Sequence, residues 1–260
     1  MATSVERRLA DLMGYEYCIL FPRARDAVRF YAEFRPITEI PSNCCPVLAA
    51  SIPYHVARVP VYPKTGLATD VPVQLYGYRQ LVRDAELEID PLMTGVMGQP
   101  FAKSSIISFG WGKTIELGAG GALLTNDRDM AVHEHRYVPK PYFPQVLREP
   151  LAHKLENLHG TIQDKWLMMK YWDQLLGDTL TRIPQEVVVP WRIIRRVPNG
   201  KRDVLVKALR AAGYNAGTNY PPLYGVTHPD AVTWGEEVIN LWGVSTDISA
   251  TCDTIKRAME

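Results

Sequence analysis

The chain has 260 residues, of which 47% are hydrophobic and 22% are charged. This length and balance fit one large globular domain, or a main domain with a smaller appendage, whose core needs no disulfide or metal support. The formal net charge of +1 argues against nucleic acid or an anionic membrane as a partner. The sequence shows neither a membrane-length apolar run nor a signal-peptide pattern, so we expect a cytoplasmic protein with four free cysteines.

The first part of the chain predicts helices that alternate with short buried strands. An amphipathic pattern at 4–13 ends at Gly14, and an apolar run follows at 16–21. Later apolar runs stand between polar turns, as in a sheet that is buried on both faces. In chain order, helices are predicted at 4–13, 26–34, 45–52 and 126–133, and strands at 16–21, 55–62, 72–76, 80–83, 105–109 and 122–125.

The second part begins with a proline-rich, aromatic segment at 137–150, which we predict to be a loop. Apolar residues then recur every three or four positions over 151–176, which predicts one long helix. The end of this helix divides a large α/β domain at 1–177 from a small α+β domain at 178–260. In the small domain, strands are predicted at 187–189, 192–197 and 238–242, and helices at 201–212 and 248–259.

The clearest chemical pattern is SSIISFGWGKTIELGAGGALLTND at 104–127. An apolar strand delivers Ser108, a glycine-bearing turn follows, and Lys113 comes next. A lysine held partly out of water on a tight turn supplies the neutral amine that a Schiff base needs. A nearby hydroxyl and glycine amides suit a phosphate. Taken alone, the stretch is explained equally well by a hairpin turn that happens to contain a lysine.

Two further features precede Lys113. Asp84 follows an apolar segment, and pyridoxal 5′-phosphate (PLP) needs a buried carboxylate beside its pyridine nitrogen. Arg23 and Arg25 stand at a predicted strand-to-helix junction, where free amides and the helix dipole bind phosphate. Taken singly, Asp84 is also explained as a helix cap, and the two arginines as a solvated turn.

In this order, the basic turn, the aspartate and the lysine resemble the DegT/DnrJ/StrS family of PLP-dependent sugar aminotransferases. The match is most specific over SFGWGKTIELGAGGALLTND, and the chain looks like a shortened, divergent member. The resemblance implies an α/β fold of the fold-type I class, similar to aspartate aminotransferase, with a mostly parallel sheet between helices. It also implies a homodimer with shared active sites.

The resemblance implies roles for individual residues. Lys113 matches the Schiff-base lysine, Asp84 the partner of the pyridine nitrogen, and Ser108 a phosphate ligand. The other positions that match cofactor segments are Ala24 and Arg25 in the phosphate turn and Cys45 beside the ring.

The activity implied is transfer of an amino group from an amino-acid donor to a keto substrate, such as a keto sugar or another biosynthetic intermediate. Two alternatives stay open: another PLP reaction on the same lysine, such as elimination, aldol-type or transaldol chemistry, and a non-catalytic truncated relative. No metal site is expected, because His153 and His159 do not share a helical face. Substrate-lining aromatic residues are expected at Tyr76, Trp111 and Tyr220, although core packing explains such residues as well.

Overall fold

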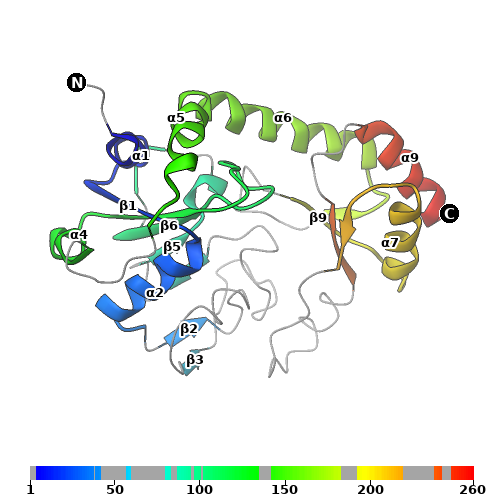
Figure 1. Ribbon diagram of the computed structural model, residues 1–260. Helices are drawn as coiled ribbons and strands as arrows, with labels where there is room; N and C mark the ends of the chain where they lie inside the picture. The colour runs from blue at the N-terminus through cyan, green and yellow to red at the C-terminus, as the bar shows by residue number, and fades with distance from the viewer. Residues whose placement is uncertain are drawn as a thin grey trace. The chain divides into compact units, whose positions relative to one another are not determined.

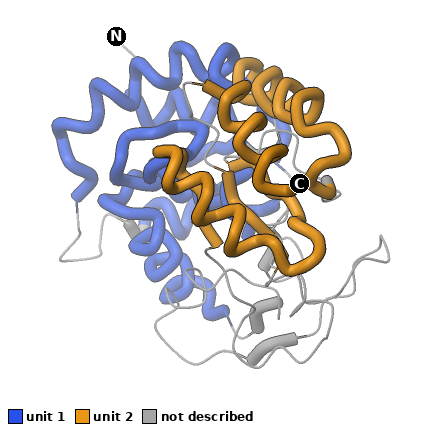
Figure 2. Tube along the Cα trace, turned by 90° about the vertical axis from the view of Figure 1, so that its right-hand side faces the viewer, with its two compact units in different colours: residues 1–41, 46–59, 79–162 blue, residues 42–45, 60–78, 163–260 orange. Residues whose placement is uncertain are grey.

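The computed structural model divides into two compact units, which Figure 2 distinguishes by colour. Unit 1 comprises Met1–Pro41, Pro46–Val59 and Arg79–Ile162, and unit 2 comprises Ser42–Cys45, Pro60–Tyr78 and Gln163–Glu260. The predicted domain limits of 1–177 and 178–260 stay a prediction. The structure describes residues 4–37, 39–41, 57–59, 80–82, 87–94, 97–100, 102–134, 142–182, 192–218, 237–241 and 247–260.

Unit 1 holds a five-stranded sheet in the order β1-β7-β6-β5-β4 and a separate parallel pair, β2 with β3. Its strands are β1 (Tyr17–Phe21), β2 (Glu39–Pro41), β3 (Ala57–Val59), β4 (Gln80–Val82), β5 (Leu87–Ile89), β6 (Ser104–Ser108) and β7 (Gly121–Thr125). Its helices are α1 (Val5–Met13), α2 (Ala24–Phe34), α4 (Arg128–Glu134), α5 (Arg148–Glu156) and the start of α6 (Leu158–Leu176), with 3-10 turns at Pro91–Thr94 and Gln145–Leu147.

The prediction of a mostly parallel sheet is wrong for the five-stranded sheet of the described strands. Only β5 and β6 run parallel, whereas the β1–β7, β6–β7 and β4–β5 pairs are antiparallel. A parallel neighbour needs a crossover of a dozen or more residues, usually through a helix. The chain between β6 and β7 holds no helix, and residues 83–86 between β4 and β5 are too few for one.

Helices cover both faces of this sheet, as Figure 1 shows with α1 and α5 on one side and α2 on the other. The α1 and α5 side shares one core with Ile107 and Leu124 of the central strands. On the other side, α2 packs against β6 and β7, and Phe30 meets Phe21 of β1 with ring centroids 5.5 Å apart. The prediction of strands buried on both faces is therefore confirmed for β6 and β7.

Local capping explains where the first helices begin and end. The Ser4 side chain accepts a hydrogen bond from the Arg7 backbone N–H, and Gly14 ends α1 in a left-handed conformation with φ +78°. Both ends agree with the predicted helix at 4–13. Helix α2 begins at Ala24, two residues before the predicted start at 26 and shortly after β1 ends at Phe21.

The region after α4 differs from its prediction in two ways. Helix α5 begins at Arg148, inside the segment that was predicted to be a loop, and the long helix predicted at 151–176 is two helices separated at Asn157. The Asn157 side-chain amide donates to the carbonyl of His153, while its backbone N–H turns to the carbonyl of Leu155. This local competition for carbonyls ends α5, and the apolar spacing gives no sign of it.

Unit 2 combines an antiparallel sheet in the order β10-β11-β9-β8 with helices. Its core joins Trp172 of α6 to apolar residues of the sheet and of the last two helices. The helices predicted at 201–212 and 248–259 are confirmed, and no helix among the described residues is long and apolar enough to cross a membrane. The remaining elements are β8 (Thr181–Arg182), β9 (Ile193–Arg196), α7 (Arg202–Ala211), β10 (Ala216–Gly217), β11 (Val238–Leu241) and α9 (Ile248–Met259).

Candidate active site

Asp90 stands at the end of β5, beside the parallel strand β6. Its backbone N–H donates to the carbonyl of Ile106 on β6 at 2.7 Å. Its φ of +51° lies in the left-handed region, which aspartate adopts more readily than most residues. The residue is 6% exposed, so its carboxylate sits inside the protein at the carboxyl ends of two parallel strands.

The Asp90 carboxylate receives donors from two directions. Nζ of Lys113 lies 2.6 Å from Oδ2, and the Ser108 backbone N–H donates to Oδ1 at 2.8 Å. The side chains of Lys113 and Asp90 are only 14% and 7% exposed. Because buried charges need partners, this pair fixes both groups in one place. The structure therefore brings together Lys113 and the strand end that carries Ser108.

The turn that carries Lys113 is closed by its own backbone. The Lys113 N–H donates to the carbonyl of Gly110 at 3.3 Å, and the Leu117 N–H donates to that of Phe109 at 2.9 Å. Gly112 has φ +76°, which glycine adopts without strain. Ile115 is fully buried and anchors the turn in the core. Lys113 is thus presented by a compact connection between β6 and β7.

Trp111 projects from the same turn and is 72% exposed. Its ring lies over Gly118, where an added Cβ would come within 2.9 Å of the indole. Because Gly118 has no side chain, the indole ring of Trp111 packs directly on its backbone. The prediction that Trp111 lines the substrate stays a prediction, and the exposed indole beside Lys113 is compatible with it.

The start of α2 lies close to β7 because of Gly121. A Cβ at Gly121 would stand 2.6 Å from Cα and 2.7 Å from N of Ala24. Gly121 pairs with Ser108 on one side and with Phe21 on the other. One glycine therefore separates the Ser108 strand from the first turn of α2, in which Ala24 and the exposed Arg25 stand.

The structure covers only some of the predicted site residues. Lys113 and Ser108 are joined through Asp90, and Ala24 and Arg25 begin α2. The sequence analysis missed Asp90, although it directly follows the short strand β5, which was also missed. The predicted site residues that lie outside the described residues are Asp84, Cys45, Tyr76 and Tyr220.

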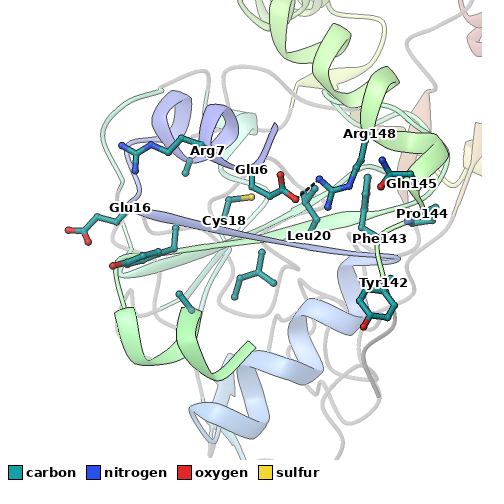
Figure 3. Close-up of a pocket in the computed structure, with 14 residues that line it drawn as sticks. Glu6, Arg7, Glu16, Cys18, Leu20, Tyr142, Phe143, Pro144, Gln145 and Arg148 are labelled. Atoms are coloured by element: carbon teal, nitrogen blue, oxygen red, sulfur yellow. Dashed lines mark ion pairs between the residues drawn. The ribbon is translucent and has the colours of Figure 1, made fainter. Parts of the chain in front are cut away.

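A separate pocket of about 880 Å³ opens beside β1, between α1 and the segment that leads into α5 (Figure 3). Glu6 and Arg148 form an ion pair in it at 2.6 Å. Burial, with Glu6 nearby, raises the pKa of the Cys18 thiol well above its ordinary value, which keeps the thiol protonated. Neither Lys113 nor Asp90 lines this pocket. The candidate active site is therefore the buried ion pair at the strand ends, and not this pocket.

No group of three or more potential metal ligands gathers among the residues that the structure describes. The candidate active site offers one lysine amine, one buried carboxylate, a serine hydroxyl and the first turn of a helix. The amine and the carboxylate meet at the carboxyl ends of the parallel pair β5 and β6, which is where α/β proteins bind ligands.

Solved structures share the fold over nearly the whole chain. A DegT DnrJ EryC1 StrS aminotransferase from Brucella abortus is 17% identical with a TM-score of 0.70, covering 98% of this chain and 88% of that one. Helicobacter pylori PseC, an aminotransferase of pseudoaminic acid biosynthesis, is 13% identical with a TM-score of 0.72, covering 98% and 90%. DesI, solved in the presence of its TDP-sugar product, is 16% identical with a TM-score of 0.72, covering 98% and 83%.

The chain therefore has the fold of the DegT/DnrJ/EryC1/StrS sugar aminotransferases, and the predicted resemblance is confirmed at this level. The α/β class is confirmed with it. No family model and no curated protein matches the sequence. At these identities the likeness defines the architecture, and activity has to be argued from the site.

Proposed function

We propose that the chain is a PLP-dependent aminotransferase that moves an amino group from an amino-acid donor to a keto substrate. The observation that carries this proposal is the buried contact between Lys113 and Asp90 at the ends of β5 and β6. PLP requires one lysine for covalent attachment and one carboxylate for its ring nitrogen. The site presents both, and solved structures with this fold include PLP and PMP forms of a putative sugar aminotransferase from Streptococcus pneumoniae.

The remaining contacts fit a phosphate group. The Ser108 side chain stands at the end of β6, and its hydroxyl accepts from the Gly110 N–H at 3.3 Å. Gly121 leaves room for the start of α2 to approach this strand end. The first N–H groups of a helix have no partner within it and favour anions. Ser108, the amides of Ala24 and Arg25, and the Arg25 guanidinium would hold the phosphate.

PLP, when bound, supplies the electron sink that lets the C–H bond at the α-carbon of an amino acid break. Lys113 would hold the cofactor, and its released Nζ would take a proton from the donor carbon and return it elsewhere as general base and acid. Asp90 would keep the proton on the ring nitrogen. Burial of both side chains excludes water and strengthens these interactions.

The place of Asp90 at the carboxyl end of β5, beside the parallel strand that carries Ser108, favours Asp90 over Asp84 as the ring partner. The matched variants Asp90→Asn and Asp84→Asn decide between them, since each removes one negative charge with little change in shape. We expect Asp90→Asn to weaken PLP binding and lower the rate of amino transfer more than Asp84→Asn does. A larger effect of Asp84→Asn would show that Asp84 is the partner of the ring nitrogen.

The comparison with solved structures also supports a proposal for the substrate class. DesI, which shares this fold, was solved in the presence of its TDP-sugar product, and another such structure is a putative sugar aminotransferase from Streptococcus pneumoniae. We therefore propose a keto sugar as amino acceptor, and the family resemblance supports our further proposal of a homodimer. Glutamate offered with nucleotide-linked keto sugars and with simple keto acids would distinguish a sugar enzyme from an amino-acid enzyme. Sedimentation measures the assembly.

The central experiment is an absorbance spectrum of the protein with PLP before and after borohydride reduction, followed by peptide mapping. We expect a cofactor band that reduction removes, with the modified peptide containing Lys113. Lys113→Ala should abolish the covalent product. Modification at another lysine, or an unchanged band in Lys113→Ala, would refute the assignment.

A further inference from the structure

Asp90 and Lys113 touch each other in a way that cofactor attachment has to undo. Their contact is 2.6 Å long, and both side chains are largely buried. The aldehyde carbon and the ring nitrogen of PLP lie at opposite ends of its pyridine ring. A lysine nitrogen joined to that carbon cannot also touch a carboxylate that faces the ring nitrogen. Contact and attachment are therefore alternatives.

We infer that the ion pair with Asp90 holds the Lys113 amine while no aldehyde is attached, and that this pair competes with attachment of an aldehyde to Lys113. This inference rests on the proposed function in taking Lys113 as the attachment point. Asp90 offers a well-held acceptor, because its Oδ1 accepts from the Ser108 N–H and its own N–H donates to Ile106. The pair therefore does not relax easily, and an incoming aldehyde has to displace it.

The chemical step shows where the competition acts. The Lys113 ammonium first leaves Asp90 and gives one proton to solvent. The lone pair of Nζ then attacks the aldehyde carbon, and the carbonyl oxygen leaves as water with one proton from Nζ and one from solvent, which gives a protonated imine. Cyanoborohydride, added as reductant, delivers a hydride to the protonated imine and leaves a stable secondary amine on Nζ. The pair opposes only the first of these events, so it slows every aldehyde that reacts at Lys113.

Salicylaldehyde is a suitable probe, because it has carbon in place of the ring nitrogen and carries no phosphate. Loss of a ring partner therefore cannot affect its reaction. The full-length chain is freed of cofactor with hydroxylamine, treated with salicylaldehyde and cyanoborohydride, and mapped by mass spectrometry over time. Exposed Lys154 and Lys207 in the same digest provide internal standards.

We expect Lys113 to be labelled about tenfold faster in Asp90→Asn than in the unsubstituted chain, which corresponds to about 1.4 kcal/mol. Asp90→Glu retains the charge and should restore slow labelling, whereas Lys154 and Lys207 should react equally in all three proteins. Equal labelling of Lys113 in Asp90→Asn and the unsubstituted chain would overturn the inference. So would fast labelling in a folded Asp90→Glu variant.

If Asp90→Asn does not fold, Asp90→Ala replaces it in the same comparison, because it also removes the charge that holds the Lys113 amine. Equal labelling of Lys113 in Asp90→Ala and the unsubstituted chain would contradict the competition. The result is separable from the proposed function. PLP mapped away from Lys113 refutes the function, whereas unchanged salicylaldehyde labelling with PLP mapped to Lys113 refutes only the competition.

Discussion

Gly121→Ala is expected to push the start of α2 away from β7. The new Cβ would stand 2.6 Å from Cα, 2.7 Å from N and 3.0 Å from Cβ of Ala24. Two of these atoms belong to the backbone, so no side-chain rotation relieves the contact. The first turn of α2 has to move, or β7 has to bend at its pairing with Ser108.

The expected loss of free energy of unfolding comes from inserting a methyl group into a space that is already filled. Overpacking of this kind typically lowers the free energy of unfolding by about 1–3 kcal/mol, and a backbone neighbour places Gly121→Ala in the upper half of that range. Gly160 on α6 provides the matched control, since a Cβ there meets nothing within 4 Å. Gly160→Ala should be neutral or stabilising by up to about 1 kcal/mol.

Urea unfolding followed by circular dichroism measures both variants against the unsubstituted chain. We expect a lower midpoint for Gly121→Ala with an unchanged slope, and a midpoint for Gly160→Ala that is equal or higher. If the phosphate site is correctly placed, Gly121→Ala should also weaken binding of PLP more than binding of pyridoxal. An unchanged midpoint for Gly121→Ala would show that α2 does not approach β7 as closely as described.

Three further predictions concern single side chains. The buried Tyr15 hydroxyl contacts the Ser105 hydroxyl, and burial raises the pKa of Tyr15 from 10.0 to about 12. The folded chain thus keeps a proton that the unfolded chain loses, so the free energy of unfolding should fall as pH rises from 10 to 12, and Tyr15→Phe should remove that component. Burial alone would raise the pKa of Asp127, but hydrogen bonds from Arg35 and from backbone N–H groups hold it below its ordinary value. Its contribution is present above that ordinary value and lost toward acid, so Asp127→Asn should flatten the acid limb of the pH–stability curve by less than about 1 kcal/mol, since Arg35 is half-exposed. Trp111→Ala should change the free energy of unfolding by less than about 0.5 kcal/mol and raise KM for the keto substrate. An unchanged KM would show that Trp111 does not line the substrate site.

The helices that were predicted correctly from the sequence are those whose ends are set by nearby capping residues. Ser4 and Gly14 bracket α1, and the capping aspartate of α9, Asp247, directly precedes a helix that was predicted at its observed bounds. The placement of Ser108 at a strand end and of Lys113 on a glycine-bearing turn was also predictable, because a strand and the turn that follows it keep their order in the fold. These features depend on a few neighbouring residues.

The carboxylate was harder to find because β5 does not look like a strand. Glu88 interrupts its apolar run, yet it is only 3% exposed. A charged residue in a three-residue strand indicates a surface turn unless the neighbours that cover it are known. Asp90 was therefore missed as a strand-end residue, and the role predicted for Asp84, which lies outside the described residues, stays a prediction. The direction of strand pairing was missed for a similar reason, since pairing is decided by distant segments.

The pairing of β1 with β7 has a consequence for the stage of folding at which the proposed phosphate site forms. Phe21 and Gly121 face each other across this pair, although they come from distant parts of the chain. Contacts between distant segments form slowly, because a long loop has to close before they give any stabilisation. The first turn of α2 reaches the Ser108 strand end only through that closure. A nascent chain that has already formed the Lys113 turn would thus lack the proposed phosphate site until β1 docks, and binding of PLP during refolding is expected to report this late event.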